Sequence, residues 1–311
     1  MANGSQVSLH YVAESTYGTT PGTPALTAIR YNSNTLNLGK EVISSEEIRS
    51  DRMTTDTRHG PKSVAGDIVT ELSYGSHDDL LAAALAGTWV SEEPASGTDQ
   101  LKAGTTRTSL TVRKYFEDLT TGNAYHVLTG CEVNSLNLSI TPGAIVGSTY
   151  SLMGQGLATQ ASEISGAVVG TASTTEALTA ISGAINEGGV AIATVTELSL
   201  TIENGMETRF VVGSDETLQP SIGRSKVSGS VTAYYEDQAL LDKFIDETNS
   251  SLDVTLLDTA GNQIKIDIPN IVFTSGAPDV GGEGPITLSM SFDAVYDSTN
   301  DTNLLIERTP A

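Results

Sequence analysis

The chain has 311 residues, which is enough for two ordinary domains or one large β domain. It carries 16 Lys and Arg residues against 38 Asp and Glu residues, so its formal net charge is −22. Such an acidic excess argues against a groove that grips phosphates and against docking on an anionic membrane, because both need clustered Lys and Arg. One cysteine, Cys131, excludes an internal disulfide and a four-cysteine zinc site. No signal peptide is expected after Met1.

Alternation of apolar and polar residues predicts β-strands along most of the chain. The first clear strand is 64–74, where apolar residues fall on one face and Asp67, Glu71 and Ser73 on the other. Further strands are predicted at 132–141, 146–153, 195–203, 227–235, 251–257, 263–268 and 286–296. Only 78–89 and 236–248 have the apolar spacing of a helix. The sequence therefore predicts a mainly β protein with two short helices.

An internal repeat organises the chain. The strand motif Val64-x-Gly66-x-Ile68 recurs in the second half as Val227-x-Gly229-x-Val231. Two further landmarks recur in the same order and at nearly the same spacing: Ser50-Asp51 upstream as Ser214-Asp215, and the helix leucines Leu80-Leu81 downstream as Leu240-Leu241. We therefore expect two tandem β-sandwich or barrel domains, each with one short flanking helix.

The expected boundaries are a first domain at 1–155 with an extended N-terminal arm, a connector at 156–192 and a second domain at 193–311. The connector is rich in Ala, Gly, Ser and Thr, which is typical of a flexible linker. Asn186-Glu187-Gly188-Gly189, however, is typical of a hairpin turn, so part of the connector is expected to pair as β-structure. Glycine weakens a strand unless a bulge or a close backbone approach requires it, which makes Gly66 and Gly229 candidate structural glycines.

No catalytic, cofactor or metal site is expected. The four histidines have no metal-ligand spacing, and no phosphate-binding loop or nucleophile elbow occurs. Cys131 has no flanking basic residue, which favours a buried apolar role over a nucleophile. The acidic segment 297–303 lacks the glycine and closing glutamate of a calcium loop. A structural role is the better hypothesis.

Several segments, in order, resemble the tail tube (major tail) proteins of long, non-contractile-tailed bacteriophages of the siphophage type. They are 12–24 (VAESTYGTTPGTP), 46–52 (EEIRSDR), 66–81, 198–205 (LSLTIENG) and 212–215 (VGSD). The resemblance implies a β-sandwich with a flanking helix, whose strands join those of neighbouring subunits into an inner barrel. It also implies a virion protein that stacks as rings into a tube through which genome DNA is ejected, with no enzymatic activity.

The implied partners are further copies of the chain, the tail tip or baseplate and terminator proteins, the tape measure protein inside the lumen, and DNA in transit. Assembly would take place in the host cytoplasm, and no membrane partner is expected. If the chain holds two tube domains, three chains would complete a ring of six domains with approximate sixfold symmetry. The alternative is six chains per ring, with the second half hung outside.

Two polar segments, 40–60 and 205–223, precede the repeated strand motif and are expected to build the inner wall. Their acidic residues are the candidates to face the lumen or the adjoining ring: Glu46, Glu47, Asp51, Asp56, Glu207, Asp215 and Glu216. An acidic wall would suit a DNA conduit, because a basic one would hold the DNA in place.

Other non-enzymatic β proteins remain alternatives: a capsid decoration protein, an adhesin of tandem Ig-like domains, or the tube of a contractile injection system. Ig-like domains would normally lack the helices, and an exported adhesin would carry a signal peptide. The injection-system tube usually has a single, unduplicated domain. A glycan-degrading enzyme is disfavoured because Trp89 is the only tryptophan available to wall a sugar cleft.

Overall fold

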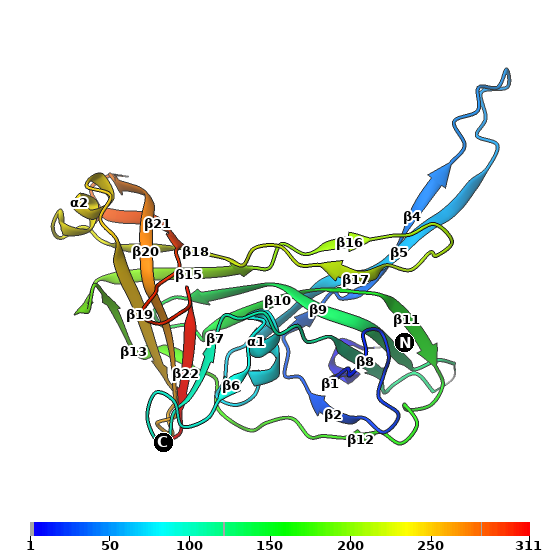
Figure 1. Ribbon diagram of the computed structural model, residues 1–311, viewed down its shortest axis with the longest axis horizontal. Coiled ribbons are helices and arrows are strands. Elements are labelled where there is room, and N and C mark those ends of the chain that lie inside the picture. Colours follow the sequence, from blue (N-terminus) through cyan, green and yellow to red (C-terminus); the bar gives the residue numbers. More distant parts are fainter. Residues whose placement is uncertain (1–2, 121, 281) are drawn as a thin grey trace.

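The computed structural model describes residues 3–120, 122–280 and 282–311, and the chain is mainly β, as predicted (Figure 1). The strands up to the middle of the chain are β1 (Val7–Ala13), β2 (Ala25–Ala28), β3 (Ser33–Asn34), β4 (Asn37–Ser44), β5 (Thr57–Glu71), β6 (Trp89–Val90), β7 (Asp99–Lys102), β8 (Leu110–Phe116), β9 (Tyr125–Ile140), β10 (Gly147–Gly154), β11 (Gly156–Gln160) and β12 (Val168–Val169). Those that follow are β13 (Thr179–Glu187), β14 (Val190–Ala191), β15 (Val195–Glu203), β16 (Glu207–Arg209), β17 (Leu218–Ser221), β18 (Lys226–Tyr234), β19 (Ser250–Leu257), β20 (Gln263–Asp279), β21 (Thr287–Ala294) and β22 (Leu305–Thr309).

One antiparallel layer, which we call the inner sheet, runs through both halves of the chain. Its strand order is β4-β5-β10-β9-β15-β18-β21-β20, and every neighbouring pair is antiparallel. Within the inner sheet the two halves meet where β9 pairs with β15, from Ser135 opposite Glu203 to Ile140 opposite Leu198. Because this junction is a regular ladder, the backbone hydrogen bonding continues from one half into the other.

Each half also has an outer layer, which is reached by one long strand. The first part of β9 pairs with β8 and β11, and β8 pairs with β1. Likewise the first part of β20 pairs with β19 and β22, and β19 pairs with β13. The alternating apolar side chains of the inner and outer strands are buried between these layers, among them Ile68, Leu138, Val231 and Phe292.

The passage from outer to inner layer occurs at a bulge that has the same position in both halves. In β9 the ladder with β10 shifts between Val133 and Ser135, and in β20 the ladder with β21 shifts between Phe273 and Ser275. Ser135 of the first bulge thus corresponds to Ser275 of the second, and the ladders beyond them match residue for residue. A bulge bends its strand, which lets one strand serve two layers.

The 156–192 segment divides between the two halves. Its β11 pairs with β9 and its β12 with β2, both from the first half, whereas β13 pairs with β19 of the second half. A hairpin at Gly188 and Gly189 joins β13 to β14, with Glu187 opposite Val190. Strand β13 takes the place beside β19 that β1 takes beside β8. Ile185 faces Val254 in the second half, and Leu9 faces Lys114 at the equivalent positions of the first half.

The two helices, α1 (Asp78–Ala84) and α2 (Ala239–Ile245), are shorter than the sequence predicts. Helix α1 ends where Ala86 takes a φ of 47°, and α2 ends where Glu247 takes a φ of 52°. Each helix has a polar tie to the equivalent outer strand. The Tyr11 hydroxyl donates to Asp79 over 2.8 Å, and the Lys243 amine contacts both carboxylate oxygens of Glu187 at 2.6 and 2.7 Å.

Gly66 and Gly229 lie at equivalent places in the inner sheet. A Cβ atom on Gly66 would come within 2.5 Å of the Leu36 backbone, and Gly66 has a φ of +147°. A Cβ atom on Gly229 would come within 2.3 Å of the Ser199 carbonyl oxygen and 2.5 Å of the Phe292 ring. The close neighbour at both glycines is therefore the backbone of the adjacent strand segment, joined at Gly229 by the Phe292 ring.

Substituting either glycine by alanine should destabilise the inner sheet, because strand backbone cannot move aside as a flexible side chain can. We expect Gly66→Ala and Gly229→Ala to lower the free energy of unfolding by about 2 kcal/mol or more, with a fall of several degrees in the thermal midpoint. Gly147→Ala is the matched control, since no atom lies within 4 Å of its Cβ position. Equal midpoints for all three variants would show that the close approaches are unimportant.

Candidate functional site

The inner sheet has one apolar face and one polar face. Both helices lie on the apolar side: a Cβ atom on Gly276 of β20 would meet Leu241 and Phe244 of α2 at 3.5 Å. The opposite face, which we call the open face, carries Ser, Thr and Asn residues from successive strands. On the described ladders from the β5–β10 pair to the β21–β20 pair, its charged residues are Asp67, Glu71, Glu197, Glu203, Lys226, Asp279 and Asp293. Six of these seven charged residues are acidic, so the open face is a hydroxyl-rich and acidic surface.

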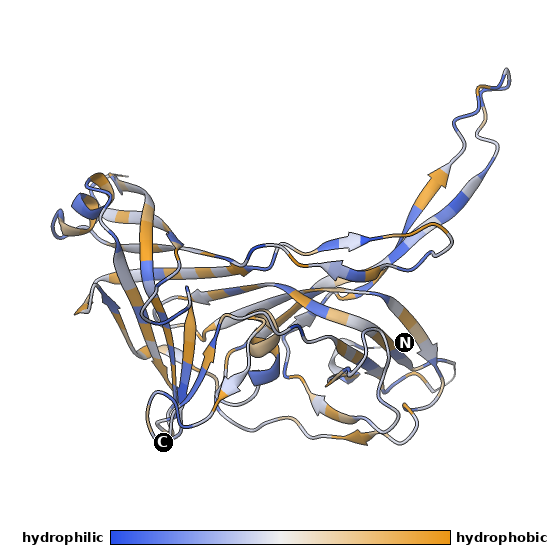
Figure 2. Ribbon diagram, viewed as in Figure 1, coloured by the Kyte–Doolittle hydropathy of each residue, from blue (hydrophilic) through white to orange (hydrophobic). Residues whose placement is uncertain are grey.

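The first hairpin, formed by β4 and β5 with the 45–56 tip, projects far from the rest of the chain (Figure 1). Apolar residues continue along its β4 strand well beyond the core (Figure 2). Val42 and Ile43 are 62% and 58% exposed, and Ile48 at the tip is 99% exposed. Exposed apolar residues concentrated on one projecting element mark an interaction surface.

The second hairpin, formed by β16 and β17, lies over the first half of the chain (Figure 1). Its turn is fastened to β5 at Lys62. The Lys62 backbone N–H donates to the Asp215 carbonyl oxygen over 2.7 Å, and the Lys62 amine lies 3.2 Å from the Asp215 carboxylate and 3.1 Å from that of Glu216. The hydrogen bonds to Glu216 and Asp215 raise the pKa of the Lys62 amine. This lysine clasp holds the second hairpin against the base of the first.

The acidic candidates from the sequence thus fall into two separate groups. Glu46, Glu47, Asp51 and Asp56 lie on the exposed tip of the first hairpin, where Asp51 pairs with Arg49 and Asp56 with Arg58, both at 2.6 Å. Glu207, Asp215 and Glu216 lie on the second hairpin. The acidic residues of the open face were not singled out from the sequence. In the sequence they are the polar residues of the alternating strands. These residues form one surface only when the order of the strands in the sheet is known.

The two hairpin tips share one further property. Ile48 stands in the same place relative to Ser50-Asp51 as Val212 does relative to Ser214-Asp215. Both side chains are fully solvent-exposed in the single chain, at 99% and 107%. The two hairpin tips therefore carry an exposed apolar side chain at the same position of the repeat.

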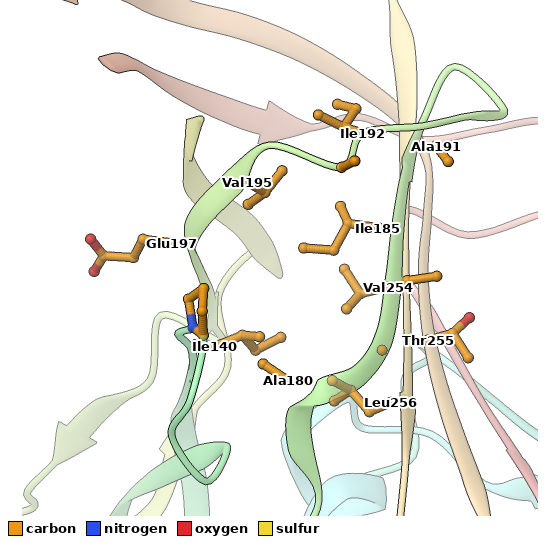
Figure 3. Close-up of a pocket in the computed structure, with 14 residues that line it drawn as sticks. Ile140, Ala180, Ile185, Ala191, Ile192, Val195, Glu197, Val254, Thr255 and Leu256 are labelled. Carbon is orange, nitrogen blue, oxygen red and sulfur yellow. The ribbon is translucent and has the colours of Figure 1, made fainter. Parts of the chain in front are cut away.

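A cleft of about 330 Å³ lies where the connector hairpin meets the inner sheet (Figure 3). Ile140, Ile185, Val195 and Leu256 line it, and the Glu197 carboxylate at its border points away from it. In the first half the residue at the repeat position of Val195 is Tyr31, whose hydroxyl donates to the Val7 carbonyl oxygen over 2.6 Å. Valine is too short for this contact and has no hydroxyl to make it.

Within the described ranges, no group of three or more His, Cys, Asp or Glu residues is placed to hold a metal ion. Cys131 is fully buried, and burial raises the pKa of its thiol, which disfavours the nucleophilic thiolate. Burial likewise lowers the pKa of His77, which favours the neutral imidazole. In the part of the chain that the structure describes, no helix is both long and apolar enough to cross a membrane.

The tail tube resemblance implied a β-sandwich with a flanking helix, and the structure is mainly β, with an inner sheet, outer layers and one helix in each half. The family model described as phage tail tube protein matches residues 4–294. The chain belongs to the phage tail tube protein family. No curated protein matches the sequence. As a member of this family the chain is a structural component of a phage tail.

The lysine clasp gives a prediction about the tail tube protein in its unassembled state. Lys62→Ala should leave overall stability within about 1 kcal/mol, because partly exposed ion pairs contribute little. Amide hydrogen exchange in 208–218 should nevertheless become faster, since the turn is then tied to β5 at this position only by the hydrogen bond from the residue 62 backbone N–H to the Asp215 carbonyl oxygen. Lys226→Ala is the control, because its amine is 57% exposed and lies 3.8 Å from Asp293. Unchanged exchange in 208–218 would contradict the role of the clasp.

Proposed function

We propose that the chain consists of two tube domains and that three chains close a ring, which stacks on further rings to form the tail tube and its DNA conduit. The observation that carries this proposal is the inner sheet, whose strands run unbroken across both halves. Among the described residues, β4 pairs only with β5, and the 275–279 part of β20 pairs only with β21. Unpaired edges at both ends of one sheet invite closure, because a closed barrel has no edges.

The size of the barrel favours three chains over six. Each chain contributes eight inner strands. Three chains would give about 24 strands, and with about 4.8 Å between strands and a tilt of about 40° the backbone diameter is about 50 Å. Six chains would give a barrel about 100 Å across by the same geometry. The smaller barrel leaves room for a double helix inside the side chains without a wide empty annulus.

The open face is the proposed lumen wall. In a closed ring the helices and outer layers occupy the outside, which leaves the open face inside. Its acidic side chains repel phosphates, and Lys226 is its one base on the described ladders that run from the β5–β10 pair to the β21–β20 pair. Duplex DNA binds where Lys and Arg release its counterions, so this wall lets DNA slide without being held.

The tips of the two hairpins are the proposed contacts with the adjoining ring. Their acidic residues Glu46, Glu47, Asp51, Asp56, Glu207, Asp215 and Glu216 remain candidates to face the lumen or the adjoining ring. The family match supports this tail role over that of an adhesin or a capsid decoration protein. Tape measure, terminator and tail tip proteins are the further partners that a tube in a siphophage tail would meet.

Negative-stain electron microscopy and mass measurement test the proposal together. Purified protein should form rings or tubes with a hollow axis. An isolated ring should have a mass of about 97 kDa, three times the 32.4 kDa chain. Averaged end views should show six similar lobes that alternate between two kinds. A ring of six chains would reject the tandem tube domains, and monomers at every concentration would reject the tube itself.

Removing the exposed apolar side chains should weaken assembly without unfolding the chain. We expect Ile48→Ser, Val212→Ser and above all the double variant to raise the concentration needed for tubes, by about tenfold for each side chain that becomes buried. Val168→Ser is the control, because Val168 is 69% exposed but lies on β12, away from the hairpins. Tubes that form as readily with both serines present would show that the hairpin tips make no apolar contact.

A further inference from the structure

The internal junction between β9 and β15 shows how two tube domains of this sequence join. Leu136 faces Ile202, Asn137 faces Thr201 and Leu138 faces Leu200. The Asn204 N–H donates to the Asn134 carbonyl oxygen over 2.8 Å in the same register. Because antiparallel pairs alternate, Leu138 and Leu200 form a hydrogen-bonded pair, whereas Asn137 and Thr201 do not. The Asn137 amide instead donates to the Thr201 hydroxyl over 2.9 Å.

The free part of β20 is the repeat of the β9 segment in this junction. Ser135 faces Ser151 next to its bulge, and Ser275 faces Ser291 next to the equivalent bulge. Counting along both strands from these equivalent serines places Ala277 at the position of Asn137 and Pro278 at that of Leu138. Residues 274, 275 and 277–279 are exposed in the single chain.

The β4 edge is the repeat of β15. Leu200 faces Gly229, and the Leu36 backbone lies against Gly66, the equivalent glycine. Leu36 therefore takes the position of Leu200, and Leu38 takes that of Ile202. These side chains keep their apolar character, so the β4 edge presents the same face as β15.

The outward backbone groups of the two edges also match. The Thr35 N–H donates to the Asp67 carbonyl oxygen over 2.9 Å, so Leu36 and Leu38 direct their backbone groups away from β5. The Tyr235 N–H donates to the Ile286 carbonyl oxygen over 2.9 Å. Because hydrogen-bonding direction alternates along β21 and then along β20, Pro278 and Gly276 direct their backbone groups away from β21. Both edges therefore direct backbone groups outward at the positions that the internal junction uses. In the single chain the Leu36 N–H donates to Asn34 Oδ1 over 2.8 Å and the Leu38 N–H to Asn37 Oδ1 over 2.9 Å, so these two side chains must turn aside when the edges pair.

Proline lacks a backbone N–H, so Pro278 cannot donate to the residue opposite it. The residue in the repeat position opposite Pro278 is Leu36, and its carbonyl oxygen already accepts a hydrogen bond from the Lys114 amine of the same chain. The Lys114 amine comes from β8, underneath the β4 edge. The Lys114 amine of the same chain thus gives the Leu36 carbonyl oxygen the hydrogen bond that Pro278 of a neighbouring strand could not donate.

We propose that the β4 edge of one copy pairs with the β20 edge of the next in the register of the internal junction, with Leu36 opposite Pro278 and Asn37 opposite Ala277. The Lys114 amine replaces the N–H that Pro278 lacks. The proposal rests on the ring-forming function and adds the contact between chains. A proline at this edge also disfavours pairing with unrelated strands, since it breaks the regular ladder.

Engineered cysteines test the register. Asn37 and Ala277 correspond to a pair without backbone hydrogen bonds, in which Cα atoms lie about 4.5 Å apart, within disulfide range. Asn37→Cys/Ala277→Cys should give, on oxidation of assembled protein, covalent oligomers that end at a closed trimer on non-reducing gels. Cys131 is fully buried and does not compete. Asn137→Cys/Thr201→Cys is the positive control, because the same pair then forms within one chain.

Leu38→Cys/Ala277→Cys is the register control. A shift of one residue turns the side chain to the other face, so cross-linking should fall at least tenfold. Equal cross-linking of both pairs, or tubes that form without cross-linking of the first pair, would overturn the register while the proposed function stands. Failure of the unsubstituted protein to form rings would overturn both.

The lysine is tested by a rescue. Lys114→Met should raise the concentration needed for ring formation by about tenfold, the effect of one lost hydrogen bond to a charged donor. Pro278→Ala in the same chain restores a backbone N–H and should recover most of this loss. Assembly equal to that of the unsubstituted protein in Lys114→Met, or an equal loss with and without Pro278→Ala, would exclude the lysine from the contact between chains. Circular dichroism of each variant reports whether the chain itself is folded.

Discussion

A β-strand carries hydrogen-bonding groups along both edges, and the architecture depends on how β9 satisfies both of its edges. Its first part pairs with β8 and β11 in the outer layer, and its second part pairs with β10 and β15 in the inner sheet. The bulge between Val133 and Ser135 lets the strand change layers. Because β15 belongs to the second half, the same strand that completes one half also holds the other. In β20 the corresponding edge has no such neighbour within the described part of the chain.

Much of the strand content could be predicted because alternation is a local property. The strand predicted at 195–203 coincides with β15, and those at 146–153 and 227–235 lie within one residue of β10 and β18. The predicted helices were too long because residues of positive φ, Ala86 and Glu247, follow their last turns. Helical spacing of side chains does not reveal where the backbone leaves the helical region.

The arrangement of those strands was beyond the sequence. Residues 156–192 have the composition of a linker, yet Ile185 pairs with Val254, and Gly156 pairs with Thr129. Pairing depends on partners distant in sequence, which short-range patterns do not encode. For the same reason the hairpin acids were easier to single out than Glu197 or Asp293. Acidic loops stand out in a sequence, whereas one face of a sheet exists only once its strands are ordered.

The cleft at Val195 illustrates what fusion of two similar halves makes possible. In a ring of identical single-domain subunits, every change in sequence is copied to all positions around the axis. Two similar halves within one chain are free of that constraint, because Tyr31 in one half has Val195 as its counterpart in the other. The second half then has a cleft next to Val195, lined by Ile140 and Ile185. Natural selection can therefore shape two kinds of outer surface while the shared backbone ladder stays under common restraint.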